Sequence, residues 1–429
     1  MSKSKINVGL LGMGTVGRGV YRILKDNRAG IEQKVGAPVD IKKILVRDPD
    51  KDRGLELEQG LLTTEAGDII NNPDIDIVVE VLGGINPALE YSLRALKQGK
   101  SLVTANKDMI AAHGKELFQA AGENGCDLFF EASVAGGIPV IRPLKECLAA
   151  NRIRQVIGIV NGTTNYMLTR MSKEGLTFDE ALAQAQALGY AEADPTADVA
   201  GHDAARKMAI IASIAFNTRV SLEQVFLEGI TRITTEDIKY AAELNYVVKL
   251  LGIAKESDDG IEVRVHPALL PEDHPLAPVD DVYNAIHVSG DAVGDVMFFG
   301  RGAGELPTAS AVVGDVMSAA RYKLRDVSGM SSCTCYGEKY VKPMGLTSTK
   351  YYIRLNVADR PGVLASIAFV FGNNDVSLAS VIQKHTTGQA AEIVLVTHRV
   401  LEKNLQDALR IIKELSTVNE VSNVIRVED

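Results

Sequence analysis

Short apolar runs alternate with amphipathic stretches along the first 130 residues of the chain. Short apolar runs are typical of buried strands, whereas apolar residues that recur every three or four positions are typical of helices. A repeated strand–helix–strand order predicts an α/β fold with a doubly wound parallel sheet. The strands that we expect are residues 6–12, 39–46, 75–82, 101–106 and 127–133.

The pattern changes after residue 133. Strand-like runs at 152–160, 261–270 and 285–290 surround three expected helices, which predicts an α+β domain with a mixed or antiparallel sheet. A well-patterned helix at 305–322 follows a glycine-rich turn, and the polar stretch 326–349 is typical of a linker. The last 80 residues have the order βαββαβ, which is typical of a ferredoxin-like sheet with both helices on one face.

The composition is that of an ordinary globular protein, with 46% apolar and 24% charged residues. A net charge of −9 argues against a nucleic-acid partner, although a small anionic ligand needs only a local site. We expect no membrane span, because no apolar run approaches the ~18 residues that a spanning helix needs. The spacing of Cys126, Cys147, Cys333 and Cys335 fits neither a zinc site nor a disulfide framework, so we expect reduced thiols and a cytoplasmic location.

Gly12, Gly14 and Gly17 form the pattern G-x-G-x-x-G between the first expected strand and the helix after it. In that context the first glycine permits the turn, the second lets the backbone approach a pyrophosphate, and the third lets helix and strand pack closely. The helix N-terminus would face the phosphates with free N–H groups. We therefore predict a Rossmann-type dinucleotide site; the alternative is a purely structural turn.

The end of the second expected strand bears on the choice between NAD and NADP. An acidic residue there binds the ribose 2′-hydroxyl of NAD, whereas arginine accommodates the 2′-phosphate of NADP. Arg47 and Asp48 are both present, and Arg47 stands nearer the strand. The sequence favours NADP, with some use of NAD.

Asp203 and Lys207 are four residues apart at the start of an expected helix, so both project from one face. A solvated surface pair is the ordinary interpretation of this spacing. The run "MAIIASIAFN" that follows predicts a buried helix, in which a charge is costly unless it is paired or faces a cleft. We favour a cleft-facing lysine. Lys107, just past the end of an expected parallel strand, is a second candidate, since ligands bind at that edge of such sheets; the alternative is a surface lysine.

Several motifs together resemble those of the homoserine dehydrogenases, in the order of that family and over residues 5–325. The C-terminal "NVADRPGVLASIAFVFGNNDVSL" resembles an ACT domain, a small regulatory module that binds amino acids. The resemblance is to the monofunctional bacterial type with an ACT extension. The motifs are "GLLGMGTVG", "VTANK", "EASVAGGIP", "NGTTNYML", "GYAEADPTADVAGHDAARK" and "GRGAGELPTASAVVGD".

The resemblance implies NAD(P)-dependent interconversion of L-homoserine and L-aspartate 4-semialdehyde, a step of threonine, methionine and isoleucine biosynthesis. Lys207 would be the general acid and base, Asp203 would orient it, and Lys107 would lie by the nicotinamide and the substrate. Glu192 would bind the substrate's ammonium group with help from Asp198, which has helix capping as its alternative role. The histidines His202, His266 and His287 show no ligand spacing, so we expect structural roles for them.

The resemblance also implies a cofactor site and a monovalent-cation site, with sodium as the expected ion. Glu131 and the backbone carbonyls of Val134, Gly136 and Ile138 would hold the ion; the alternative for this segment is a structural turn. The expected domains are 1–133 with 302–325 for the nucleotide, 134–301 for substrate and dimerisation, a linker at 326–349, and the ACT domain at 350–429. The cofactor site would comprise Leu11, Gly12, Gly14, Thr15, Val16, Gly17, Arg47, Thr104, Lys107 and Gly304.

The turn from Asp359 to Gly362 would lie near the effector site of a paired ACT domain, with threonine as feedback inhibitor. A purely oligomerising module is the alternative. We expect a homodimer, which ACT pairing could double to a tetramer. Two other functions stay open on the sequence alone: another amino-acid or semialdehyde dehydrogenase on this scaffold, or a non-catalytic amino-acid sensor.

Overall fold

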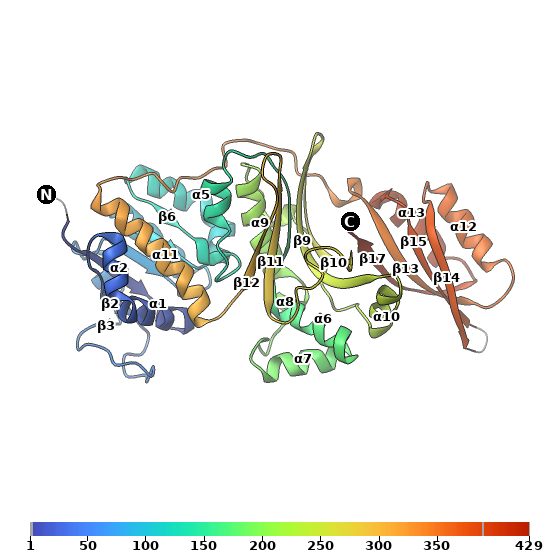
Figure 1. Cartoon of the computed structure of the whole chain (residues 1–429), viewed down its shortest axis with the longest axis horizontal. Coiled ribbons are helices and arrows are strands. Elements are labelled where there is room, and N and C mark those ends of the chain that lie inside the picture. The colour runs from blue at the N-terminus through green and yellow to red at the C-terminus, as the bar shows by residue number, and fades with distance from the viewer. Residues whose placement is uncertain (1–2, 388–389, 429) are drawn as a thin grey trace. The chain divides into compact units, whose positions relative to one another are not determined.

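The computed structural model describes residues 3–387 and 390–428 (Figure 1). The chain divides into two compact units, each made of three segments. Unit 1 comprises Met1–Ile153, Ala209–Leu222 and Gly290–Glu338, and unit 2 comprises Arg154–Met208, Glu223–Ser289 and Lys339–Asp429. The domain boundaries expected from the sequence stay a prediction. Within the described ranges, no helix combines the length and the apolar character needed to cross a membrane.

Unit 1 contains a six-stranded sheet in the order β3-β2-β1-β4-β5-β6, and every recorded pairing in it is parallel. This confirms the predicted doubly wound sheet. The short β3 was not predicted, and the last expected strand ends early, because Glu131–Ser133 forms a 3₁₀ turn. The strands are β1 (Ile6–Leu11), β2 (Val39–Leu45), β3 (Leu62–Thr63), β4 (Ile77–Glu80), β5 (Ser101–Thr104) and β6 (Leu128–Phe129).

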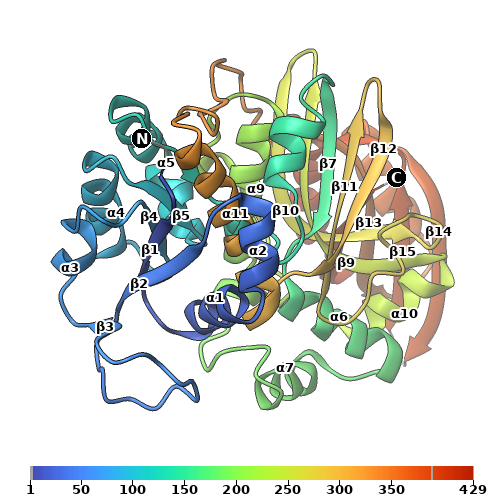
Figure 2. The ribbon, with the colours of Figure 1, turned by 60° about the vertical axis from the view of Figure 1, so that its left-hand side comes forward.

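Helices cover both faces of this sheet (Figure 2). The long helix α11 (Glu305–Leu324) returns late in the sequence and packs against α1 (Thr15–Asp26). Gly19 permits the close approach, since a Cβ there would lie 2.8 Å from the Cβ of Ala309. Arg22 of α1 donates to Glu305 over 2.8 Å. The other helices are α2 (Arg28–Val35), α3 (Gly67–Ile70), α4 (Ala88–Lys97) and α5 (Lys107–Glu123).

Unit 2 contains a mixed sheet that begins with the order β11-β7-β9-β10, where β9 is antiparallel to both β7 and β10. This confirms the predicted mixed sheet. The long strand β9 (Tyr246–Ser257) was not predicted, because "YVVKLLGIAKES" is apolar on both faces and its periodicity does not separate strand from helix. The other strands are β7 (Ile153–Ile159), β8 (Phe226–Leu227), β10 (Gly260–Pro271) and β11 (Tyr283–Gly290), and β12 (Gly294–Arg301) follows in unit 1.

The helices of this part of the chain begin with α6 and α7, which lie between β7 and the charged segment 189–207. α9 starts in that segment, in unit 2, and its second half belongs to unit 1. Their bounds are α6 (Gly162–Glu174), α7 (Phe178–Ala187), α8 (Thr196–Val199), α9 (His202–Ala215) and α10 (Thr235–Glu243).

The C-terminal part of unit 2 has the predicted βαββαβ order, with strands arranged β17-β13-β15-β14. β17 also pairs in parallel with β10, where Ala268 is opposite Arg426, so its sheet continues the mixed sheet of unit 2. The core between helices and sheet is apolar. The elements are β13 (Ser348–Ala358), α12 (Val363–Asn373), β14 (Leu378–Thr387), β15 (Ala390–Thr397), β16 (Val400–Leu401), α13 (Glu402–Lys413) and β17 (Val418–Val427).

Candidate active site

The three glycines of the fingerprint have the separate roles that a dinucleotide site requires. Gly12 has a φ of 104°, in the region that favours glycine, and it starts the turn after β1. A Cβ at Gly17 would lie 2.3 Å from the Gly12 carbonyl oxygen, so α1 packs on the turn only because this residue is glycine. Around Gly14, the N-cap residue of α1, an added Cβ would meet no atom within 4 Å. The turn is thus closed at Gly12 and Gly17 and open at Gly14, which fits a pyrophosphate.

The remaining predicted cofactor residues of this turn differ in exposure. Leu11 is buried, Val16 is half-buried and Thr15 is exposed at the first position of α1. Arg47 and Asp48 lie two and three residues after the end of β2, and both are exposed. Both side chains are therefore accessible near the end of β2, and their positions alone do not distinguish NAD from NADP.

A buried hydrogen-bond network ties the ends of β4 and β5 together. The Thr104 hydroxyl donates to Glu80 over 2.6 Å and accepts from the Asn106 backbone N–H. Asn106 caps α5 by accepting from Met109, which places Lys107 at the first position of that helix. Burial raises the pKa of Glu80, and its hydrogen bond from Thr104 opposes the rise. Glu80 was missed by our sequence analysis; the available signal was an acidic residue within the otherwise apolar run "IVVEVL" at 77–82.

The segment 131–138 is a tight loop that the carboxylate of Glu131 organises. Its two oxygens accept the backbone N–H groups of Val140, Ile141 and Arg142 over 2.6–2.8 Å. Gly136 has a φ of 53°, and a Cβ there would lie 2.2 Å from the Gly302 carbonyl oxygen. The backbone of Gly136 therefore packs closely on Gly302, two residues before Gly304, the N-cap residue of α11. Among the described residues no group of three or more His, Cys, Asp or Glu side chains could hold a metal.

Lys207 and Asp203 lie together on α9 as a nearly buried ion pair in unit 2. The Lys207 ammonium donates to Asp203 over 2.7 Å and to the Val160 carbonyl oxygen over 2.6 Å. The two side chains are only 12% and 11% exposed, so the interpretation as a solvated surface pair is wrong. A buried pair with directed hydrogen bonds has a fixed geometry, as an acid–base group requires.

Asn161, which our sequence analysis did not single out, joins two carboxylates of this cluster. Its amide N–H groups donate to Asp198 over 2.7 Å and to Asp203 over 2.9 Å. Its amide oxygen accepts from Thr164 and so caps α6. The motif "NGTTNYML" was the available signal, but nothing in it shows which groups the asparagine would reach.

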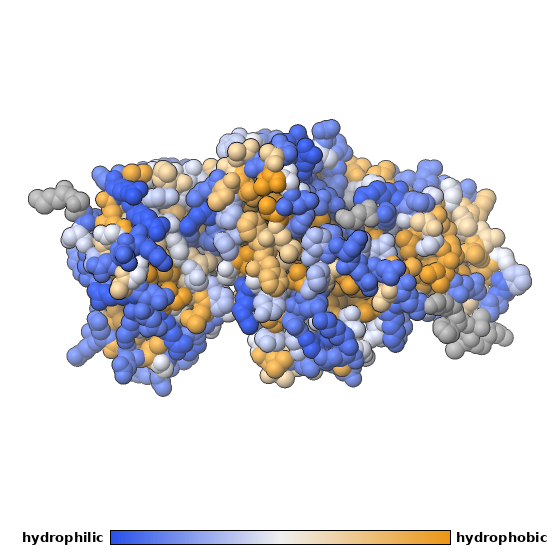
Figure 3. Space-filling model, in the orientation of Figure 1, coloured by the Kyte–Doolittle hydropathy of each residue, from blue (hydrophilic) through white to orange (hydrophobic). Residues whose placement is uncertain are grey.

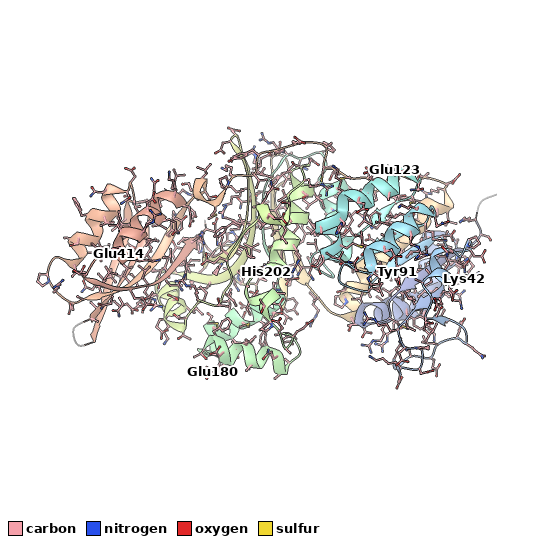
Figure 4. All side chains as sticks on the ribbon, turned by 180° about the vertical axis from the view of Figure 1, so that it is seen from behind. Lys42, Tyr91, Glu123, Glu180, His202 and Glu414 are labelled. Carbon is pink, nitrogen blue, oxygen red and sulfur yellow. The ribbon has the colours of Figure 1, made fainter. Side chains whose placement is uncertain are left out.

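Asp198 belongs to the cluster and does not act as a helix N-cap, since that position of α8 is taken by Pro195. Burial raises the pKa of Asp198, the hydrogen bond from Asn161 opposes this rise, and the charge of Asp203 adds to it. Glu192 is exposed in the segment between α7 and α8. His202 is exposed at the first position of α9 (Figure 4). The structure thus brings Asn161, Asp198, Asp203 and Lys207 together.

A second network of charges lies where β17 meets β10. Arg264 donates to Glu428 over 2.6 Å and to the His266 imidazole over 3.1 Å, and all three side chains are buried. Burial is the main cause that lowers the pKa of His266, so the ring is neutral and accepts from Arg264. This outcome agrees with the structural role expected for His266. On β17, Arg426 donates to Glu228 over 2.7 Å.

A Rossmann-type sheet with an open glycine turn, a buried lysine–carboxylate pair and a ferredoxin-like C-terminal domain are together typical of a nucleotide-dependent oxidoreductase with an ACT domain. Family models identify the same parts. Residues 12–131 match "Homoserine dehydrogenase, NAD binding domain", residues 139–317 match "Homoserine dehydrogenase", and residues 351–417 match "ACT domain".

Relatives match over the whole length. The homoserine dehydrogenase of Bacillus subtilis is 47% identical and covers 99% of this chain and 98% of its own, and that of Corynebacterium glutamicum is 46% identical, covering 99% and 96%. The crystal structure of a homoserine dehydrogenase from Thiobacillus denitrificans has a TM-score of 0.94 at 44% identity and covers 99% and 98%. The chain belongs to the homoserine dehydrogenase family, and it is an oxidoreductase. A different dehydrogenase or a non-catalytic sensor is not favoured.

Proposed function

We propose that the enzyme interconverts L-homoserine and L-aspartate 4-semialdehyde, with the cluster around Lys207 acting on the oxygen of the reacting carbon. The observation that carries this proposal is the cluster of Lys207, Asp203, Asn161 and Asp198, linked by hydrogen bonds of 2.7–2.9 Å. A bound nicotinamide would supply or accept the hydride. Negative charge then develops on the aldehyde oxygen, and a positioned cation that also donates a proton stabilises it.

Each residue of the cluster has a distinct proposed role. Two of the three ammonium N–H groups of Lys207 are directed at Asp203 and Val160, and the third is the proposed donor to the substrate oxygen. Asp203 holds the ammonium in place, and Asn161 holds Asp203. Asp198 and Glu192 are the proposed partners of the substrate ammonium group. Lys107 is the proposed second cation beside the nicotinamide and the substrate.

We propose NADP as the favoured cofactor and NAD as a second one. Arg47, exposed two residues after the end of β2, supports this choice, since guanidinium pairs well with a phosphate. A hyperthermophilic archaeal homoserine dehydrogenase, 30% identical and covering 73% of this chain and 97% of its own, has a solved mutant structure in complex with NADPH, with a TM-score of 0.63. Steady-state assays with both cofactors test the proposal: Arg47→Ala should lower kcat/KM for NADP and leave that for NAD nearly unchanged.

A sodium ion at the loop 134–138 remains our proposal for the cation site. Glu131 and the backbone carbonyl oxygens of Val134, Gly136 and Ile138 are the proposed ligands, and three backbone N–H groups hold the Glu131 carboxylate in a defined position. Carbonyl oxygens are suitable ligands for a hard cation. Replacing sodium by a large organic cation at constant ionic strength should lower thermal stability as well as turnover if the ion binds there.

We propose that the ACT domain binds threonine near Asp359–Gly362 and transmits inhibition through Glu228. The turn is exposed, and Gly362 has a φ of 89° at the start of α12. Arg426 of the ACT sheet binds Glu228 next to β8, and Ile230 two residues on donates to the Val199 carbonyl oxygen of α8 over 2.9 Å. A Cβ at Gly229 would lie 2.2 Å from the same oxygen, so this segment packs directly on the helix that carries Asp198.

The C-terminal domain also has a surface suited to self-association. Apolar side chains gather over it (Figure 3), and Phe369 of α12 is 70% exposed, with Leu364 and Val381 also exposed. We propose that this surface pairs two ACT domains, in a homodimer or a homotetramer. Measuring the mass in solution by light scattering for the whole chain and for Phe369→Glu tests the proposal, since a buried charge at this position should favour the smaller assembly.

The central test is the reaction itself. The purified enzyme is given homoserine with NAD or NADP, and the absorbance of the reduced nicotinamide is followed. Reduction that depends on homoserine supports the proposal. No reduction with either cofactor, from a folded protein that still binds the cofactor, contradicts it.

A further inference from the structure

Cys333 and Cys335 lie side by side in the polar stretch after α11 and line a small pocket of unit 1. The Cys335 backbone N–H donates to the Cys333 sulfur over 3.4 Å, and the Cys335 thiol donates to the Ser213 carbonyl oxygen over 3.8 Å. The pocket has a volume of about 40 Å³, enough for a molecule the size of water or hydrogen peroxide. The spacing of these two cysteines predicted no site, but the fold surrounds them with other functional groups.

Two cations face the pair. Arg219 donates to the Cys333 sulfur over 3.7 Å. The Lys145 ammonium donates to the Ser332 carbonyl oxygen over 2.8 Å and lies 5.4 Å from the ring centre of Phe118. α5, α9 and the segment around Phe130 contribute only uncharged residues to the described lining. A thiolate is therefore stabilised here, and a metal cation is repelled.

The two thiols differ in protonation. Hydrogen bonds from the Cys335 thiol and from its backbone N–H lower the pKa of Cys333 to about 5, and Arg219 and Lys145 add to this effect. The same thiol hydrogen bond to Cys333, made in place of the one to Ser213, raises the pKa of Cys335, and burial adds to the rise. At neutral pH the pair thus consists of one thiolate and one protonated thiol, the arrangement of a nucleophile with a resolving thiol.

We propose that Cys333 and Cys335 form a redox-active dithiol that reacts with hydroperoxides and closes into an intrachain disulfide. The Cys333 thiolate attacks one peroxide oxygen, the O–O bond breaks, and a sulfenic acid and hydroxide form. The Cys335 thiol then attacks the Cys333 sulfur; the S–O bond breaks, and the hydroxide leaves with the thiol proton as water. The two sulfurs are oxidised, the peroxide is reduced, and an added dithiol reverses the reaction.

Tryptic peptide mapping of the full-length enzyme tests this proposal. Asp326–Lys339 is a single tryptic peptide that contains both cysteines and no third one. The reduced enzyme is treated with hydrogen peroxide, blocked with N-ethylmaleimide and digested. The peptide should lose two hydrogens and take up no maleimide, whereas exposed Cys147, in its own peptide, should still be alkylated. If Asp326–Lys339 stays fully alkylated while Cys147 is oxidised, the proposal is wrong.

Variants assign the two roles. Cys335→Ser should accumulate a sulfenic acid at Cys333 that dimedone traps, and Cys333→Ser should leave Cys335 reduced at the same peroxide dose. At pH 5.5, iodoacetamide should alkylate Cys333 roughly 20-fold faster than an ordinary thiol, after allowing for the lower nucleophilicity of an acidic thiolate. Arg219→Met should move the pH midpoint of this alkylation upward. The assignment would be overturned if Cys333→Ser and Cys335→Ser were equally sensitive to peroxide. It would also be overturned if the alkylation rate of Cys333 depended on pH as that of an ordinary thiol does.

Discussion

Replacing Asn161 by aspartate isolates the amide donors that hold the candidate active site together. The wild-type amide donates to two carboxylates, Asp198 and Asp203, over 2.7 and 2.9 Å. Aspartate caps a helix as well as asparagine does, so α6 keeps its N-cap acceptor in Asn161→Asp. Only the two donated hydrogen bonds are lost. The amide is replaced by a carboxylate, which becomes the third one in the cluster.

The size of the effect follows from these contacts. A hydrogen bond to a charged group contributes about 1.5–3 kcal/mol, so losing two removes roughly 3–6 kcal/mol of interaction. Two charges about 4 Å apart repel by about 4 kcal/mol at an effective dielectric constant near 20, so the three carboxyls cannot all ionise at little cost. The variant is therefore expected to take up a proton, and a protonated carboxyl restores one donor.

The expected result is a change in pH dependence as well as in rate. Near pH 8, kcat/KM of Asn161→Asp should fall about 100-fold, the equivalent of about 3 kcal/mol. The carboxyl pKa in the folded variant is raised above its unfolded value of ~3.9, so the stability it contributes is present at low pH and is lost as the pH rises through the folded pKa. Activity relative to wild type should therefore recover toward pH 5.

Steady-state kinetics and thermal denaturation at several pH values measure both effects. Asn161→Ala is the matched control, because it loses the donors and also the cap, costs about 1 kcal/mol more, and has no group to protonate. It should show no recovery at low pH. If Asn161→Asp keeps kcat/KM within about threefold of wild type at pH 8, with an unchanged pH profile, the amide does not hold these carboxylates in place.

Four further predictions follow from other contacts in the structure. Lys207→Met should lower kcat about 100- to 10,000-fold with cofactor affinity, measured by fluorescence titration, nearly unchanged. Asp315 of α11 is buried and accepts from Arg142 over 2.7 Å. Burial raises its pKa from 3.8 to about 7 although Arg142 opposes the rise, so wild-type stability should decline as the pH rises across that range by up to about 4 kcal/mol, and Asp315→Asn should abolish the decline in thermal melts. Glu428 shows the opposite sign: burial opposes its ionisation, but Arg264 and Lys255 hold its pKa well below the usual range. The advantage of wild type over Glu428→Gln should therefore be full above pH ~5 and be lost as the pH falls. Glu228→Gln should raise the threonine concentration for half-inhibition about fivefold or more in the activity assay; unchanged inhibition would contradict the proposed route from the ACT sheet.

The sequence determined the elements whose identity depends on local pattern. Alternating apolar runs and helical periods were enough for the parallel sheet of unit 1 and for the βαββαβ order of the C-terminal domain. The glycine fingerprint could be recognised in the sequence because its glycines are required by the local backbone: Gly12 has a positive φ, and Gly17 packs closely on the turn. The i,i+4 spacing of Asp203 and Lys207 likewise predicted that both lie on one helix face, because residues four apart are neighbours on any α-helix.

Tertiary structure decided what depends on partners distant in sequence. The strand β9 escaped prediction because a segment buried on both faces carries no period, and only its neighbours β7 and β10 make it a strand. Burial of the Lys207–Asp203 pair, and the link from Asn161 to two carboxylates about 40 residues away, exist only after α6, α8 and α9 pack. Likewise Cys333 gains its cationic surroundings from Arg219 and Lys145, more than 100 residues upstream. Hydrogen bonds and charges act over a few ångströms. The neighbours that orient these side chains and shift their pKa are therefore determined by the folded structure and not by spacing along the sequence.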